Sequence, residues 1–216
     1  MVRVNIQLEL YAQTLKNLPK TGQHIIAHQT HDLLVVYQAY KPAIAAYAVK
    51  NQILGGSDFS YNRMSWIKPN FLWMMYRCGW AEKENQERVL AWWIAKSDFE
   101  EILSQAVMSS FDATYYENYE QWKNDLNTSD VRLQWDPDHD PFGNKLQRRA
   151  IQLGLKGNAL EKFGKEQIKK IEDIADFVRQ QKLKVDSRQL DELLVPVETI
   201  LQINDQAINA KIGIDQ

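Results

Sequence analysis

The chain has 216 residues, and its 26 Lys and Arg against 28 Asp and Glu give a formal net charge of -2. A charge this close to zero provides no overall field to attract nucleic acid or an anionic membrane, although a local basic pocket is compatible with it. The length predicts one domain with a well-buried core. The one cysteine, Cys78, excludes an internal disulfide framework and is typical of a reducing compartment.

No apolar run approaches the roughly 20 residues that a membrane-spanning helix needs. The first residues also lack the charged, apolar and small-residue pattern of a signal peptide. We therefore expect a cytoplasmic protein with no membrane partner.

Residues 1–22 are predicted to form an N-terminal arm or edge strand, because Ile6, Leu8 and Leu10 alternate with polar residues. Two apolar runs, 24–28 and 33–37, then predict strands on either side of a turn.

Histidines and an acid at this turn raise the question of a metal site. His28, His31 and Asp32 are residue types that bind zinc, but their spacing would point them to different faces. Ordinary turn polarity is the favoured interpretation, and we expect no metal.

The second predicted strand ends in Gln38 and Tyr40, and Pro42 then opens a helix that Gly55 and Gly56 end. Polar side chains at the end of a strand, just before a helix, commonly contact ligands in α/β sheets. Gln38 and Tyr40 are therefore candidate site residues, with capping and packing as the alternative.

The stretch 61–80 combines apolar and aromatic residues with cations. Residues 63–68 predict a strand, and Pro69 begins a helix that Gly79 ends. Charges placed among so many apolar residues need partners, which are either protein carboxylates or an anionic ligand. The candidate binding residues of this stretch are Arg63, Trp66, Lys68, Trp73, Tyr76 and Arg77.

Lys68 precedes the start of a helix, where free backbone N–H groups add to the attraction for an anion. Arg77 lies in the last turn of that helix, where the helix dipole alone favours a cation. Cys78 in the same stretch is expected to be a buried, inert thiol.

The remaining chain predicts a strand at 86–95, helices near 97–107 and 113–126, and strands at 131–136 and 148–155. The acids of the loop 137–147 fit a hydrated hairpin loop, and Arg148 is expected to pair with them. A late strand carries Glu198, and residues 204–216 are predicted to be a loose C-terminal tail.

Strands and helices are mixed without strict alternation, which favours the α+β class. We expect one α+β domain over residues 23–203, with a mixed or split antiparallel sheet flanked by helices.

Six segments together resemble the family known as domain of unknown function 4291. The resemblance extends over roughly residues 23–201, and its most specific segment is RMSWIKPNFLWMMYRCGW. The six segments are 35–40, 63–80, 86–95, 131–140, 148–155 and 195–200.

The order of parts is also similar to that of ADP-ribosyltransferases, which bind NAD in a cleft of a split β-sheet. This resemblance implies NAD as cofactor, catalytic roles for Gln38 (or Tyr40), Ser65 and Glu198, and a pyrophosphate held by Arg63, Lys68 or Arg77. ADP-ribosyltransferases have a His or Arg in the first of these roles, and this chain departs from that pattern because Gln38 or Tyr40 stands there. The late carboxylate would stabilise a positive ribosyl group as the glycosidic C–N bond breaks.

Two other functions remain open at the level of sequence. In a nucleic-acid-binding or RNA-processing protein, Arg63, Lys68, Arg77 and Arg148 would contact phosphates while Trp66 or Trp73 stacks a base. In a non-catalytic interaction protein, the cations would pair with acids such as Glu87, Asp136 or Glu198, and no small-molecule ligand would bind.

Overall fold

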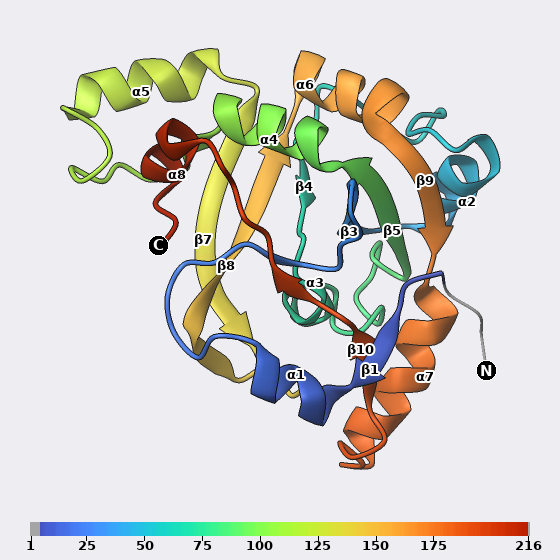
Figure 1. The fold of residues 1–216 in the computed structure, drawn as a ribbon. Coiled ribbons are helices and arrows are strands. Elements are labelled where there is room, and N and C mark those ends of the chain that lie inside the picture. Colours follow the sequence, from blue (N-terminus) through green and yellow to red (C-terminus); the bar gives the residue numbers. More distant parts are fainter. Residues whose placement is uncertain (1–4, 216) are drawn as a thin grey trace.

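The structure is a computed structural model that describes residues 5–215. Two β-sheets stand side by side with helices around them, in a single α+β arrangement that confirms the predicted class (Figure 1). The mixture of antiparallel pairs with one parallel pair, β6 on β7, confirms that the sheets are mixed.

The first sheet has the strand order β3-β5-β9 and is antiparallel throughout. The strands β3 and β5 are nearly continuous apolar runs that are buried on both faces, whereas β9 carries two lysines and two acids and is mostly half-buried. Its members are β3 (Leu33–Tyr40), β5 (Arg88–Ala95) and β9 (Ile168–Asp173).

The second sheet has the order β4-β8-β7-β6, and the long β7–β8 hairpin forms most of it. A bulge near Pro137 shifts the register of this hairpin before His139. Its strands are β4 (Ser65–Ile67), β6 (Val107–Met108), β7 (Val131–His139) and β8 (Lys145–Leu155).

Two short antiparallel pairs connect the ends of the chain to the domain. In one, the N-terminal segment pairs with the stretch just before Glu198. The pairs are β1 (Leu8–Leu10) with β10 (Leu194–Pro196), and β2 (Ile26–Ala27) with β11 (Thr199–Ile200).

Helices cover both faces of the first sheet. Side chains from α3 and α7 share one apolar cluster with Val35 and Tyr37, while α2, α4, α6 and α8 contribute to a second cluster with Leu34 and Val36. The helices are α1 (Tyr11–Asn17), α2 (Pro42–Asn51), α3 (Phe71–Cys78), α4 (Lys96–Gln105), α5 (Tyr119–Thr128), α6 (Gly157–Lys162) followed by a π-helical segment (Phe163–Gln167), α7 (Ala175–Asp186) and α8 (Gln206–Ile212).

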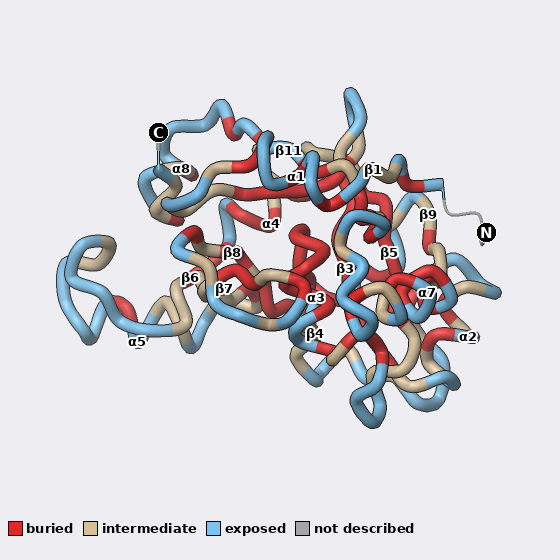
Figure 2. The backbone as a smooth tube through the Cα atoms, turned by 90° about the horizontal axis from the view of Figure 1, so that it is seen from below, coloured by how far each residue is buried: buried red, intermediate tan, exposed pale blue. Residues whose placement is uncertain are grey.

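Alternate residues of β3 therefore enter different clusters, because successive side chains of a strand point to opposite faces. Figure 2 shows the result: buried segments gather around β5, α3 and α7, whereas α5 projects outward as a largely exposed helix. Among the described residues, no helix has the length and apolar character to cross a membrane.

The prediction of a loose C-terminal tail is wrong for most of residues 204–216. Residues 206–212 form α8, whose N-terminus is capped by Asp205 and whose Ile208 and Ile212 are buried in the core. The sequence of the tail is too short and polar to show a helical pattern clearly, but these two isoleucines four residues apart lie on one helix face.

Two further boundaries differ from the prediction. The helix expected from residue 113 begins at Tyr119, where Asn118 caps it. The strands on either side of the acidic loop extend to His139 and from Lys145, so the loop is much shorter than expected.

Replacing Ile212 by Ala should lower the free energy of unfolding by about 2–5 kcal/mol, because the side chain is 1% exposed and its removal leaves a cavity. Urea denaturation measures this loss. Gln206→Ala, at an exposed position of the same helix, is the control and should change stability little. Equal stability of the Ile212→Ala protein and the wild type would mean that α8 does not pack in solution.

Candidate functional site

Lys68 lies where the two sheets meet. Its backbone exchanges two hydrogen bonds with Tyr37 of β3, at N–O distances of 2.7 and 3.0 Å, and this bridge is isolated. In a continued antiparallel ladder, Trp66 would face Ala39 two residues further along. Here the strands separate instead, so the sheet is split at this point.

The ammonium group of Lys68 fills the beginning of the split. Its Nζ donates to the carbonyl oxygen of Trp66 at 3.0 Å and is 3.4 Å from Oε1 of Gln38. The side chain is 1% exposed, whereas Gln38 and Trp66 are half-buried. Lys68 thus satisfies a backbone carbonyl that the separated strands leave without a partner.

No carboxylate of the described residues lies within 4.0 Å of Lys68. Burial above all, and then the positive charge of Arg77, lower the pKa of Lys68 to about 7, against smaller opposite effects of Cys78 and Asp136. Because Lys68 is charged in only part of the molecules near neutral pH, an anion bound beside it would restore its charge.

Arg63 and Arg77 are exposed and, within residues 5–215, are also without a carboxylate inside 4.0 Å. The acids named as internal partners, Glu87, Asp136 and Glu198, form no ion pair with the three cations of this stretch. Arg148 behaves differently, since it pairs with Asp138 at 2.6 Å in the interior, as expected for an acid of the hairpin.

Ser65 and Tyr40 lie together inside the core. The hydroxyl groups of the two side chains share a hydrogen bond, and the Tyr40 ring packs against Phe59 and Trp92. This contact satisfies both hydroxyls internally, so neither is presented to the solvent. Of the three residues predicted to be catalytic, only Gln38 lies beside Lys68.

The aromatic candidates divide between two places. Trp66 lies over β8, where a Cβ added to Gly154 would come within 3.0 Å of its ring. Trp73 and Tyr76 instead stack with His139, and the ring centroids of Tyr76 and His139 are 3.5 Å apart.

Glu198 is held at the N-terminus of α3. Its Oε1 accepts a hydrogen bond from the backbone N–H of Phe71 at 2.7 Å, and its side chain is buried. Burial raises the pKa of Glu198 well above its usual value, and nearby Asp138 adds to this rise, whereas the Phe71 amide and Arg148 oppose it.

Lys68 and Glu198 make no direct contact, although the segment 68–71 joins their surroundings. Glu198 binds the first amide of α3, whereas the charge that most affects Lys68 is Arg77 in the last turn of that helix. Lys68 itself lies three residues before Phe71, so both residues adjoin the start of α3.

The sequence predicts that Arg148 pairs with acids of the hairpin, but it does not predict that this ion pair lies near Glu198. Asp138 is completely buried with Arg148, and His139 is 2% exposed with neither ring nitrogen hydrogen-bonded to a described residue. Burial lowers the pKa of His139, which keeps it neutral. The bulge after Pro137 turns two consecutive residues inward, and the sequence pattern of a regular strand does not reveal it.

Cys78 is a free, buried thiol whose pKa is raised by burial, which confirms the expectation of an inert residue. No cluster of three or more metal-ligating side chains occurs in the described part of the chain. Two cavities, of about 370 and 550 Å³, lie away from Lys68, Gln38 and Glu198.

Comparison with known proteins connects this arrangement to one family. The family model described as Domain of unknown function (DUF4291) matches residues 24–201. No curated protein matches the chain.

Lys68→Met should stabilise the protein most at pH 7 and below. Between about pH 7 and 10.5 the unfolded chain holds the Lys68 proton more tightly than the native one, so wild-type stability rises with pH there by about 1.4 kcal/mol per unit. The advantage of the Met variant should shrink at the same rate. Urea unfolding at pH 6, 7.5 and 9 measures it, with exposed Lys50→Met as control. A difference independent of pH would contradict the lowered pKa.

Glu198→Gln should raise the melting temperature at pH 7 but little at pH 4. The raised pKa means that the native state loses stability as pH rises above 4.5, because the buried carboxyl must ionise or keep its proton at a cost. A Gln oxygen still accepts from Phe71. Calorimetry at both pH values tests this, and a drop in melting temperature at pH 7 would show that the ionised carboxylate stabilises the fold.

Proposed function

The chain belongs to the DUF4291 family, and we propose that it is a nucleotide-binding enzyme, with NAD as its nucleotide and ADP-ribosyl transfer as its reaction. The observation that carries the proposal is the set of cations around the split between β3 and β4. Lys68, Arg63 and Arg77 come from one short stretch, and none has a carboxylate within 4.0 Å among the described residues.

Phosphate groups supply what these side chains lack. A buried, unpaired ammonium is unfavourable, and Arg77 makes it more so by repulsion. A pyrophosphate between Lys68 and Arg77 would pair with both and raise the pKa of Lys68. Gln38 and Trp66, which contact the Lys68 ammonium group, are half-buried, and Trp66 would offer a ring face on which a base can stack.

Glu198 provides the complementary charge. Burial and Asp138 disfavour its ionised form, and a positive group beside it would favour that form and pair with it. When the glycosidic C–N bond of NAD breaks, nicotinamide leaves with the bonding electrons and the ribose becomes positive. Glu198 would stabilise that ribosyl cation, while Lys68 and Arg77 hold the phosphates.

The arrangement of Lys68 and Glu198 favours a ligand whose negative and positive groups are separated from each other. Lys68 is a base and Glu198 an acid, and they make no direct contact, so an anion alone would pair with Lys68 and leave Glu198 without a partner. A dinucleotide carries its phosphates several bonds away from the reacting ribose carbon and therefore matches this separation.

The test is binding and turnover of NAD. NAD or ADP-ribose at about 100 times its dissociation constant should add about 2.7 kcal/mol to the free energy of unfolding. ATP, GTP and a short RNA are tested separately in the same way for comparison. Lys68→Met should abolish most of this stabilisation, and Lys50→Met should keep it.

Glu198→Gln separates binding from chemistry. This variant should still bind ADP-ribose but release nicotinamide from NAD at least about 100-fold more slowly, because the neutral amide does not stabilise a cation. Unchanged nucleotide binding in folded Arg63→Ala and Lys68→Met proteins would overturn the proposal. Stabilisation by RNA alone, falling steeply with salt, would instead identify a nucleic-acid-binding protein.

A further inference from the structure

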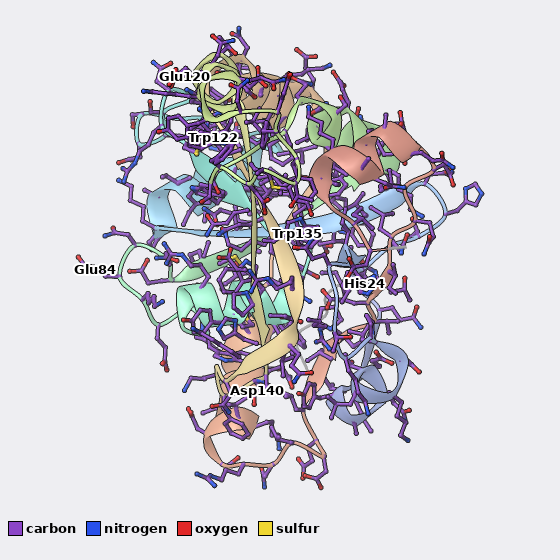
Figure 3. All side chains as sticks on the ribbon, turned by 90° about the vertical axis from the view of Figure 1, so that its left-hand side faces the viewer. His24, Glu84, Glu120, Trp122, Trp135 and Asp140 are labelled. Atoms are coloured by element: carbon purple, nitrogen blue, oxygen red, sulfur yellow. The ribbon has the colours of Figure 1, made fainter. Side chains whose placement is uncertain are left out.

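A cavity of about 370 Å³ lies between the end of α3, the tip of the β7–β8 hairpin and the end of α7. Figure 3 labels Asp140, which immediately precedes the hairpin residues that line it. None of its lining residues is Lys68, Gln38 or Glu198, so it is separate from the site described above. Its volume is within the range of roughly 300–1,000 Å³ that is usual for small-molecule pockets.

Three aromatic side chains form its walls. Tyr76 and Phe142 are 40% and 48% exposed, so both rings are accessible from the solvent. Trp80 is buried, and its Nε1 donates to the carbonyl oxygen of Pro141 at 3.1 Å, which fixes the hairpin to the end of α3. Two exposed rings on one hollow offer stacking surfaces for a planar ligand.

His139 makes the Tyr76 wall rigid. It stacks on Tyr76 with a centroid distance of 3.5 Å and an interplanar angle of 8°. One face of Tyr76 is therefore already covered, and Lys83 lies over the ring at 5.9 Å from its centroid. The ring is held in place before any ligand arrives, which lowers the entropic cost of stacking against it.

Arg188 supplies a cation without an internal partner. Lys182, the other cation of the lining, pairs with Asp186 and lies 3.7 Å from Glu82, whereas Arg188 has no carboxylate within 4.0 Å in residues 5–215.

The backbone of Arg188 is also unusual. Its φ of 59° lies in the left-handed region, which follows the end of α7 and which glycine adopts far more readily than arginine. Arg188 thus lines the cavity although its backbone conformation favours glycine at this position.

We propose that this cavity binds a nucleoside monophosphate, with its base against Tyr76 and Phe142 and its phosphate on Arg188. The rings match a planar base, the single unpaired guanidinium matches one phosphate, and the volume suits one nucleotide rather than a polymer. This inference does not depend on NAD binding at Lys68, because none of the residues that line the cavity is Lys68, Arg77 or Glu198.

Calorimetric titration of the Lys68→Met protein tests this cavity alone. AMP, GMP, CMP and UMP are the probes, with adenosine as the uncharged comparison. We expect AMP or GMP to bind, and adenosine to bind more weakly by roughly tenfold, which is the usual effect of one charge-assisted hydrogen bond.

Arg188→Gly is the decisive variant, because glycine suits the left-handed backbone and the protein should fold at least as well as the wild type. It should weaken AMP binding to the level of adenosine and leave adenosine binding unchanged. Phe142→Ala, at an exposed position, should weaken both ligands. Absence of binding for all four monophosphates at millimolar concentration would overturn the proposal, and so would an AMP affinity in the folded Arg188→Gly and Phe142→Ala variants equal to that of the protein without these substitutions.

Discussion

The isolated backbone bridge between Tyr37 and Lys68 is the constraint on which the rest of the structure depends. It joins the two sheets at one point, and beyond it the strands separate. The start of α3 directly follows, so the same few residues determine where the sheets meet and where the helix begins. Figure 1 shows α3 below β4, between the long hairpin and the β3–β5 pair. A change at this junction would therefore move both sheets and the helix together.

Splitting a sheet leaves backbone groups that need partners in a place that water reaches poorly. Lys68 satisfies the Trp66 carbonyl, and Glu198 satisfies the first amide of α3. Each of these contacts places an ionisable group in the interior, where burial disfavours its charged form. The polar residues that complete these backbone contacts are thus the same residues whose charges the proposed ligand would stabilise. Burial by itself favours the neutral form of both groups.

The sequence predicted the secondary structure well where apolar runs are long, and it predicted the structure poorly where a few contacts determine it. The strands β3 and β5 were recognisable because residues such as Val35 and Trp92 leave no polar face. The helix α8 was missed because only Ile208 and Ile212 indicate it. A charge at position 68 clearly required a partner, but no pattern indicates that its ammonium returns to the carbonyl of its own strand. That contact exists only because the strands separate, which is a property of the three-dimensional arrangement.

The charge of Arg148 is paired with Asp138, whereas Arg63 and Arg77 have no carboxylate partner among the described residues. From the sequence, all three arginines are candidate phosphate contacts. In the structure, however, Arg148 has a buried carboxylate at 2.6 Å and also donates to the carbonyl oxygen of Pro19. Its charge is balanced internally, and it lowers the cost of ionising Glu198 beside it. Arg77 has no such balance and instead raises the cost of charging Lys68. The chain thus carries one cation that supports the buried acid Glu198 and another that disfavours the charged form of the buried base Lys68. An internal salt-bridge network would have paired the second cation as well, and its lack of a carboxylate partner among the described residues is what the proposed phosphate site rests on.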